Sequence, residues 1–277
     1  MTDFVAWHPS DAAHHVAIPF DASDKYSRGV LGIITGSDRY PGAAVLGVDA
    51  ALHTGVGMVR YLGGERASTL VLQRRPEAVT ADGRVQAWLI GSGTDSVDKE
   101  GDAEAATEAA LGQSLPTVLD VGALERVREA HGPTIITPHF GELARLLDVG
   151  RSRIEADPAR WALTAADELD VTVMLKGHHT FVAGGGVALV ASTAPSWTAT
   201  AGAGDALAGI LGALVATHTG FDAEGSLLAR LAATASVLHG LAAHRASAGG
   251  PFTILELIAN LPPVIAELVA FRTAGKR

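Results

Sequence analysis

The sequence contains no cysteine. This absence excludes disulfide bonds, cysteine nucleophiles and metal centres with thiolate ligands. It is compatible with a reducing compartment, where structural disulfides are rare.

Basic residues are scarce as well. The only lysines are Lys25, Lys99, Lys176 and Lys276, and the formal net charge is −9. Generic binding to nucleic acid requires clustered Lys and Arg that displace counterions from the phosphates, so we expect no nucleic-acid partner. An anionic ligand would have to be bound by backbone N–H groups and a few well-placed cations.

Targeting signals are the third absence. Residues 1–20 contain neither Lys nor Arg, so the charged start of a secretory signal peptide is missing. No apolar run reaches the roughly 18–20 residues that a membrane-spanning helix needs. We therefore expect a soluble, cytoplasmic protein without a membrane partner.

The chain does have 277 residues, of which 48% are hydrophobic, and this is enough for one large α/β core. Short β-branched runs alternate with alanine-rich stretches. Several runs are apolar at consecutive positions, as in strands that are buried on both faces. A single α/β domain over residues 1–277 with a mostly parallel sheet is predicted. Its predicted strands are 30–35, 58–62, 87–90, 117–120, 134–137 and 171–175.

Helices are predicted between these strands and over the C-terminal third. The runs 180–183 and 187–191, linked by glycines, instead predict an antiparallel hairpin. Thr253 and Glu256 fit a capping box, and Pro262-Pro263 is expected to break the helix that follows. The predicted helices are 42–53, 100–111, 124–130, 158–169, 205–217, 225–244 and 253–270.

Polar or turn residues directly follow five of the predicted strands. In an open parallel sheet, ligands bind beyond the carboxyl ends of the strands. These residues are therefore expected to share one edge of the sheet. They are Ser37, Gly91–Thr94, Asp120, Thr137–His139 and Lys176.

The segment Gly202-Ala203-Gly204-Asp205 precedes an apolar stripe with helical spacing. Glycines before a helix let backbone N–H groups approach an anion, and the helix dipole favours phosphate there. Asp205 could take the proton of a hydroxyl that attacks this phosphate. The alternative is an ordinary Asp at a helix start behind a flexible turn.

Three further segments are candidates for ligand binding. Lys176-Gly177 ends an apolar strand and could hold a phosphate, or it could open a hairpin on the surface. In Thr137–Glu142, His139 could contact a ligand and Glu142 could meet a metal through water; a proline turn with a helix start is the alternative. Ser37–Ala44 is a turn into a helix that permits close approach of a flat ligand or of backbone. No phosphate-binding GxxxxGK[ST] or dinucleotide-binding GxGxxG motif occurs.

In this order, the segments resemble the family of ADP/ATP-dependent NAD(P)H-hydrate dehydratases, a branch of the ribokinase-like fold. The resemblance covers roughly residues 23–245, after an N-terminal extension of residues 1–22. The residues that carry it are Lys25-Tyr26, Gly29, Gly36-Ser37, Tyr40, Gly42-Ala43, Ala50-Ala51-Leu52, Thr54-Gly55, Gly57, Ile90-Gly91, Gly93, Leu119-Asp120, Ala123-Leu124, Thr137-Pro138-His139, Gly141-Glu142, Leu175-Lys176-Gly177, Thr180, Gly202 and Gly204-Asp205.

The resemblance implies a ribokinase-like three-layer α/β/α sandwich. It also implies that ADP or ATP phosphorylates the ring hydroxyl of the S epimer of hydrated NADH or NADPH, after which elimination of phosphate restores NAD(P)H. Mg²⁺ would accompany the nucleotide, and a homo-oligomer, specifically a tetramer, is expected. By the same resemblance Asp205 is the base and contacts the substrate. Tyr40, Ala43, Gly93 and His139 are expected to line the substrate pocket, and Lys176, Gly177, His178, His179, Thr180, Gly202 and Gly204 to hold the nucleotide. Glu142 remains the candidate to meet the metal through water.

The chain departs from the family pattern at four positions. Gly122 stands where the second carboxylate of Asp-Ala-Asp-Ala-Leu is usual, Thr35 replaces a glycine, Ser92 a proline and Ala203 a threonine. Two alternatives therefore stay open: a ribokinase-like kinase for a sugar or a hydroxymethylpyrimidine, and a catalytically inactive nucleotide-binding paralogue.

Overall fold

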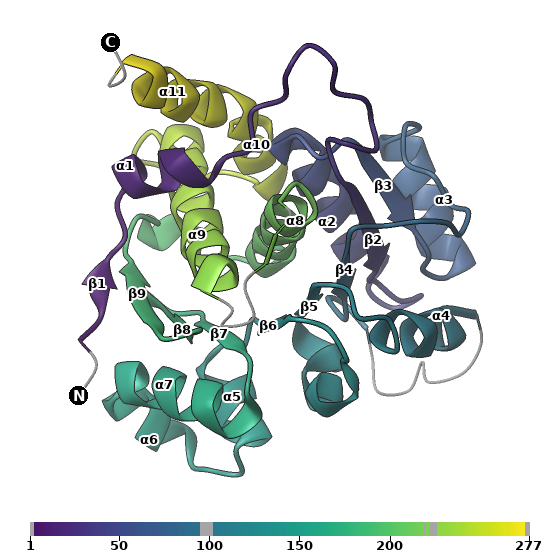
Figure 1. The fold of residues 1–277 in the computed structure, drawn as a ribbon. Coiled ribbons are helices and arrows are strands. Elements are labelled where there is room, and N and C mark those ends of the chain that lie inside the picture. Colours follow the sequence, from purple (N-terminus) through teal and green to yellow (C-terminus); the bar gives the residue numbers. More distant parts are fainter. Residues whose placement is uncertain (1–2, 95–101, 219, 222–225, 275–277) are drawn as a thin grey trace.

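The chain is described by a computed structural model over residues 3–94, 102–218, 220–221 and 226–274 (Figure 1). Within these residues nine strands form one sheet, in the order β1-β9-β8-β7-β6-β5-β4-β2-β3. Neighbouring strands are parallel except at β7–β8 and β8–β9, where the hairpin reverses the chain. The strands are β1 Val5–Ala6, β2 Val30–Ile34, β3 Met58–Tyr61, β4 Ala87–Ile90, β5 Thr117–Leu119, β6 Thr134–Ile136, β7 Thr172–Leu175, β8 Thr180–Gly184 and β9 Val187–Ala191.

Helices cover both faces of this sheet. The helical elements are α1 Pro9–Ala12, η1 Ala13–His15, α2 Pro41–Thr54, α3 Glu65–Arg74, α4 Asp102–Leu111, η2 Val121–Glu129, α5 Phe140–Leu146, α6 Arg151–Ala156, α7 Pro158–Leu169, η3 Ser196–Thr198, α8 Ala203–Ala216, α9 Ser226–Ser247, α10 Ile254–Ala259 and α11 Leu261–Ala274. Two separate hydrophobic cores result, one with α1, α2 and α8–α11 and one with α4–α7 and η2.

Strand β2 shows how the sequence produces this arrangement. All of its residues are buried. Successive side chains of a strand point to opposite faces of the sheet, and helices cover both of these faces. Leu31 and Ile33 belong to the core with α8, whereas Val30 and Ile34 belong to the core with α4–α7. The predicted three-layer sandwich with a mostly parallel sheet is therefore confirmed.

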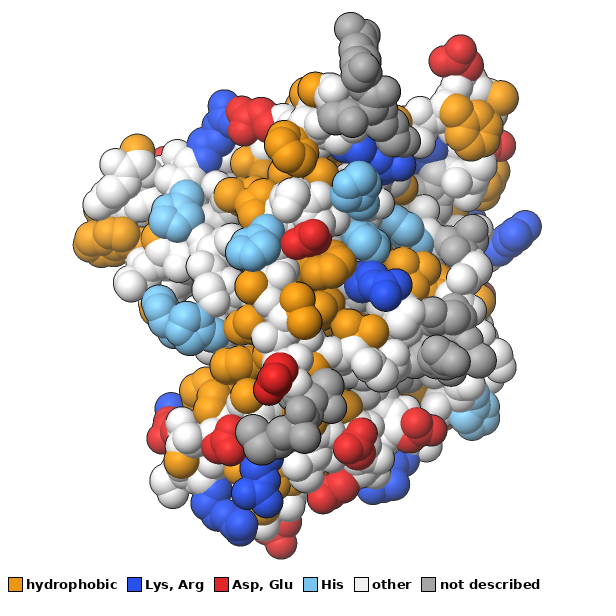
Figure 2. Space-filling view, turned by 60° about the vertical axis from the view of Figure 1, so that its left-hand side comes forward, with side chains coloured by type: hydrophobic (Ala, Val, Ile, Leu, Met, Phe, Trp, Pro, Cys, Tyr) orange, Lys and Arg blue, Asp and Glu red, His pale blue; other side chains and the backbone are white. Residues whose placement is uncertain are grey.

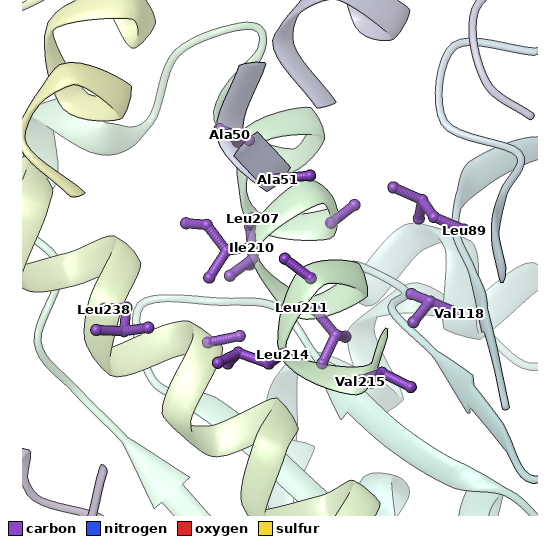
Figure 3. Packing of buried hydrophobic residues seen from close by; sticks show 14 of the residues in the cluster. Ala50, Ala51, Leu89, Val118, Leu207, Ile210, Leu211, Leu214, Val215 and Leu238 are labelled. Atoms are coloured by element: carbon purple, nitrogen blue, oxygen red, sulfur yellow. The ribbon is translucent and has the colours of Figure 1, made fainter. Parts of the chain in front are cut away.

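Helix α8 is the central helix of the larger core (Figure 3). Its side chains Leu207, Ile210 and Leu211 point into the packed interior between α2, α9 and the sheet, and Leu238 of α9 faces the same cluster. Helices α2 and α8 approach closely because Gly209 has no side chain: a Cβ there would collide with the Gly47 carbonyl. This packing fixes the N-terminus of α8 relative to the strand ends.

Most predicted elements lie within two residues of the observed ones, but two predictions need correction. The predicted helix 124–130 overlaps a 3₁₀ helix, Val121–Glu129, which ends one residue earlier. The predicted break at Pro262-Pro263 lies two to three residues earlier, at Asn260, and both prolines occupy the first turn of α11. Proline is tolerated there because the first N–H groups of a helix have no partner within it. The first residues predicted for two helices, Glu100, Gly101 and Gly225, lie outside the described residues.

Two stretches, Ser226–Ser247 and Ile254–Ala274, are long and apolar enough to span a bilayer by length and composition alone. Neither is an uninterrupted apolar run, because the first contains Arg230 and Arg245 and the second contains Glu256 and Glu267. In an 18-residue window of the first stretch, 78% of the residues are buried inside the fold, as in a core helix. The second is interrupted at Asn260.

Candidate functional site

The carboxyl ends of β4, β5, β6 and β7 meet the N-terminus of α8 at one edge of the sheet. Three side-chain hydrogen bonds cross this edge: Ser92 to Asp205, Thr137 to Asp120 and Lys176 to Asp120. The edge predicted from the strand ends is thus confirmed for these residues, which lie far apart in sequence.

The N-terminus of α8 leaves room for a ligand to approach its backbone closely. Gly202 has a left-handed backbone (φ 91°) that glycine adopts without strain. The position that a Cβ would take at Gly204 lies 3.7 Å from Lys176 Nζ. The ammonium of Lys176 therefore lies beside the start of α8 at a position that carries no side chain, and an anion can bind in such a place.

Asp205 lies in the first turn of α8 and accepts a hydrogen bond at Oδ1 from the hydroxyl of Ser92. Burial raises the pKa of the Asp205 carboxyl above its ordinary value, and the charge of Asp120 acts in the same direction; the Ser92 bond and the Lys176 charge oppose this shift. A carboxylate with a raised pKa is a stronger base, as proton abstraction requires.

Lys176 and Asp120 form a buried ion pair. Asp120 is 1% exposed, and its Oδ1 lies 2.7 Å from Lys176 Nζ and 2.6 Å from Thr137 Oγ1. Burial lowers the pKa of Lys176, but Asp120 and Glu142 raise it more, so the net shift is upward and the ammonium is charged at neutral pH. Asp120 Oδ2 is buried without a hydrogen-bond partner.

His139 caps α5 and lies beside Lys176. Its Nδ1 accepts from the N–H groups of Gly141 and Glu142, at 2.9 and 3.3 Å, and Glu142 accepts in return from the His139 backbone at 2.8 Å. The Lys176 N–H donates to the Pro138 carbonyl at 2.8 Å, which fixes His139 next to the lysine. The His139 ring is half exposed, so it can meet a ligand at the edge of the site.

The predicted substrate-pocket residues Ala43 and Gly93 lie against each other. A Cβ at Gly93 would collide with the Ala43 side chain, and the Tyr40 carbonyl lies 3.2 Å from the same position. Tyr40 itself is exposed at the start of α2, with its N–H bonded to Ser37 Oγ at 3.1 Å. The glycine at 93 therefore brings the turn after β4 into contact with α2.

The predicted nucleotide segment is the turn from β7 to β8. Lys176 opens it and Thr180, which is buried, closes it, while Gly177, His178 and His179 are exposed. His179 Nδ1 lies 2.5 Å from Ser192 Oγ. The ammonium of Lys176 lies next to Gly204 at the start of α8. Within the described part of the chain, the exposed His178 and His179 make no contact with this helix start.

A cavity of about 950 Å³ adjoins the site at the ends of β2, β4 and β5. This volume lies at the upper end of the usual range for ligand pockets. Gly36, Gly91 and Glu142 line it next to the site, and Arg66, Arg126 and Arg145 line it as well. Arg126 is paired with Glu104 and Glu129, at 2.9 and 2.6 Å.

Gly122 is also part of the cavity wall. A Cβ at this position would collide with Thr94 Oγ1, which donates to the Gly91 carbonyl at 2.8 Å. The preceding residue, Val121, has a left-handed backbone (φ 39°), which is uncommon for a β-branched residue. Thr94 occupies the space that a carboxylate at position 122 would need. Glycine at 122 is therefore consistent with the position of Thr94.

The described residues contain no group of three or more His, Asp or Glu side chains placed to hold a metal ion. Mg²⁺ commonly binds through one or two carboxylates, waters and the phosphates of a nucleotide, so this donor set fits a nucleotide-borne ion and not a protein cage. Glu142 is the carboxylate suggested by the sequence. Its two oxygens already contact His139, at 2.8 and 3.0 Å.

The sequence placed Asp205, Lys176 and His139 at the site but gave no role to Ser92 or Asp120. The sequence did contain a signal for Asp120. It is a carboxylate directly after a buried strand, and a buried carboxylate requires a partner. The hydrogen bond of Ser92 had no comparable signal, since its partner follows 113 residues later.

Comparisons with known proteins place this site in context. A family model described as NAD(P)H-hydrate dehydratase matches residues 31–258. A bifunctional NAD(P)H-hydrate repair enzyme of Mycobacterium tuberculosis is 40% identical over 78% of the chain and 47% of its own length. An ADP-dependent (S)-NAD(P)H-hydrate dehydratase of Xanthomonas campestris is 33% identical over 72% of the chain and 76% of its own length.

A solved structure of a protein with the same family description is also similar to this chain. The ADP/ATP-dependent NAD(P)H-hydrate dehydratase of Bacillus subtilis, co-crystallized with ATP/Mg²⁺, superimposes with a TM-score of 0.84 at 25% identity, over 97% of the chain and 100% of that protein. Solved ribokinase-like structures share the fold as well. The chain spans about half the length of the bifunctional relatives it matches.

Proposed function

Since the chain belongs to the NAD(P)H-hydrate dehydratase family, we propose that it converts the S epimer of hydrated NADH or NADPH back to NAD(P)H in an ADP- or ATP-dependent reaction. The observation that carries the proposal is the position of Asp205, a carboxylate with a raised pKa at the N-terminus of α8, opposite the ammonium of Lys176.

Asp205 is proposed to act on the hydroxyl of the hydrated ring. One of its oxygens is bonded to Ser92, and its other oxygen has no hydrogen-bond partner among the described residues. That second oxygen is free to accept the hydroxyl proton as the hydroxyl attacks the phosphate. Ala43, Gly93, His139 and Tyr40 are proposed to line the position of the ring.

Lys176 and the start of α8 are proposed to hold the transferred phosphate. Gly204 leaves room for the phosphate beside backbone N–H groups, and Lys176 supplies the positive charge. The rest of the nucleotide would lie along the turn from β7 to β8, against Gly177, His178, His179 and Thr180, and by Gly202. Asp120 orients Lys176 through the 2.7 Å ion pair.

Mg²⁺ is the proposed cofactor, with ADP or ATP as the co-substrate. When bound, the ion neutralises part of the phosphate charge. Glu142 is proposed to contact the ion through water, because each carboxylate oxygen has lone pairs beyond those that accept from His139.

The 950 Å³ cavity is proposed to hold the remainder of the substrate dinucleotide, because it adjoins the site and has the size of a ligand pocket. We further propose that the protein is cytoplasmic and forms a homo-oligomer, with a tetramer as the expected state. Sedimentation equilibrium of the purified protein would measure that state directly.

The test of the proposed function is recovery of NADH absorbance. The purified protein is incubated with Mg²⁺, hydrated NADH and either ADP or ATP. A nucleotide-dependent rise in absorbance is expected, and the faster nucleotide identifies the phosphoryl donor. A stable phosphorylated product without NADH would instead favour a kinase, and nucleotide binding without any turnover would favour an inactive paralogue.

The variant Asp205→Asn tests the base. We expect turnover to fall by about 10²–10⁴-fold, the usual contribution of a general base, because an amide cannot accept the hydroxyl proton. Binding of ADP, measured by calorimetry, should stay within a few fold of the wild type.

Asp167→Asn is the matched control, since Asp167 lies in α7 on the other face of the sheet. Turnover of Asp205→Asn at the wild-type rate would exclude Asp205 as the base.

A further inference from the structure

Ser92, in the turn after β4, carries its side chain to Asp205. Gly91 and Gly93 flank it with left-handed backbones (φ 102° and 67°). A Cβ at either glycine would collide with a neighbour, at Gly91 with the Asp120 carbonyl and at Gly93 with Ala43. The turn is thus packed tightly between α2 and the end of β5.

Backbone hydrogen bonds hold this turn in place. The Gly36 N–H donates to the Ser92 carbonyl at 2.6 Å, and the Gly91 N–H donates to the Ile34 carbonyl at 3.0 Å. Ser92 is 1% exposed, and its hydroxyl donates to Oδ1 of Asp205. A buried hydroxyl on a rigid turn keeps the carboxylate in one orientation, with only Oδ2 open to a ligand.

The charged groups around Asp205 come from several elements. Asp120 after β5 raises the pKa of Asp205, and Lys176 after β7 lowers it. His239 of α9 bonds to the backbone at Ala203, and burial lowers the pKa of this histidine to about 4, so it is neutral near pH 7. Helix α2 presents Gly47 to the Asp205 backbone. The hydroxyl of Ser92 is therefore the sole uncharged side-chain donor to Asp205 among the described residues.

We propose that Ser92 is a positioning residue for the proposed base: its hydrogen bond orients Asp205 and stabilises the ionised carboxylate, so that the base works at lower pH than burial alone would permit. This inference rests on the proposed function. A donor that favours the charged form of a carboxylate lowers its pKa and opposes the effect of burial.

The test compares the pH dependence of kcat/KM for Ser92→Ala with that of the wild type. In the variant the acid limb of the profile should move upward by about one pH unit, because a hydrogen bond to a charged group contributes on that order. The plateau at higher pH should remain within about tenfold, since the base itself is kept. Ser92→Thr, which keeps a hydroxyl, should restore the wild-type limb.

Ser247→Ala is the matched control. Ser247 is also a buried serine, and its hydroxyl donates to the Gly250 carbonyl at 2.6 Å and does not contact Asp205. A shift in Ser247→Ala equal to that in Ser92→Ala would assign the effect to general loosening of the fold and would overturn the proposal. Superimposed profiles of wild type and Ser92→Ala would overturn it as well.

A second readout does not depend on turnover. The Asp205 carboxyl is titrated by ¹³C NMR with labelled aspartate, assigned by comparison with Asp205→Asn. Its pKa should be higher by about one unit in Ser92→Ala than in the wild type. An unchanged pKa would overturn the role of Ser92. The predicted change without any dehydratase activity would keep that role and reject the proposed function instead.

Discussion

Two carboxylates lie in one site with different surroundings. Asp205 is bonded to a neutral hydroxyl and has a raised pKa, whereas Asp120 is paired with the ammonium of Lys176. Different environments give two acidic groups different chemical roles. Asp205 is suited to accept a proton, and Asp120 is suited to hold a cation in position.

The variant Asp120→Asn tests the second role. Lys176 loses its charged partner but keeps an amide oxygen, so its ammonium is held less firmly beside Gly204. We expect affinity for ADP and ATP to fall by about tenfold or more, the loss that corresponds to one charged hydrogen bond. Isothermal titration calorimetry measures this directly.

Glu125→Gln is the control for this prediction. It removes the same charge from an exposed position in the adjoining η2 segment and leaves Lys176 paired. Equal loss of affinity in both variants would show that net charge near the cavity matters, and not the ion pair.

At the level of elements, helices α2 and α3 are joined by a buried charge. Asp49 of α2 is 0% exposed and is bonded to Arg74 at 3.0 Å and to Arg75 at 2.5 Å. His53 Nδ1 lies 3.0 Å from the same carboxylate. Burial raises the pKa of Asp49, but the bonds from His53, Arg75 and Arg74 together lower it more, so the net shift is below the ordinary 3.8.

Asp49→Asn should lower the free energy of unfolding by about 3 kcal/mol at pH 7, because two arginines lose their charged partner at a buried position. Both arginines reach solvent, which keeps the loss at the lower end of the range for buried pairs. Urea unfolding followed by circular dichroism measures the difference.

The pH dependence of this difference has a defined sign. A carboxyl whose folded-state pKa is depressed stabilises the fold above its unfolded pKa, and this contribution is lost as pH falls through the folded pKa. The difference between wild type and Asp49→Asn should therefore be full above about pH 5 and shrink as pH falls through the lowered pKa of Asp49. Glu77→Gln, at an exposed carboxylate 3.7 Å from Arg75, should change stability little at any pH. A constant difference down to pH 2 would contradict the ionic origin.

At the scale of the whole molecule, the N-terminal segment is part of the fold. Strand β1 pairs in parallel with β9 at the edge of the sheet, and α1 packs against α9. Trp7 Nε1 donates to Thr234 Oγ1 of α9 at 3.1 Å. The segment described as an extension from the sequence therefore closes one end of the larger core (Figure 1).

Trp7→Phe should lower stability by about 1–2 kcal/mol, because the buried Thr234 hydroxyl loses its donor. The melting temperature and the urea midpoint measure this loss. Trp197→Phe is the control, since Trp197 is 52% exposed and should tolerate the change. In a double-mutant cycle, Trp7→Phe should cost less in a Thr234→Val background, and fully additive effects would exclude the hydrogen bond as the cause.

The charge distribution also belongs to this scale. Acidic and basic side chains both occur on the face shown in Figure 2, and several histidines are spread across its upper half. With a net charge of −9, an anionic substrate would depend on local groups such as Lys176 and the start of α8, not on the overall field.

Local pattern in the sequence determined much of this protein. Consecutive apolar residues in 30–34 indicate a strand buried on both faces, and Gly202 through Asp205 before an apolar stripe indicate the start of α8. These features could be predicted because they depend on neighbouring residues and on the periods of strand and helix. The residues at the strand ends likewise indicated the edge at which Asp205 and Lys176 meet.

Only the tertiary structure decided which of these residues are partners. Ser92 bonds to Asp205 across 113 positions and Lys176 to Asp120 across 56. Such pairs depend on strand order and on the packing of α8 against α2, which no local pattern specifies. The same holds for Gly122, whose missing carboxylate is explained by Thr94 in the space beside it. The sequence thus determined the chemistry available at the edge of the sheet, and packing decided how it is oriented, because hydrogen bonds require contact within about 3 Å.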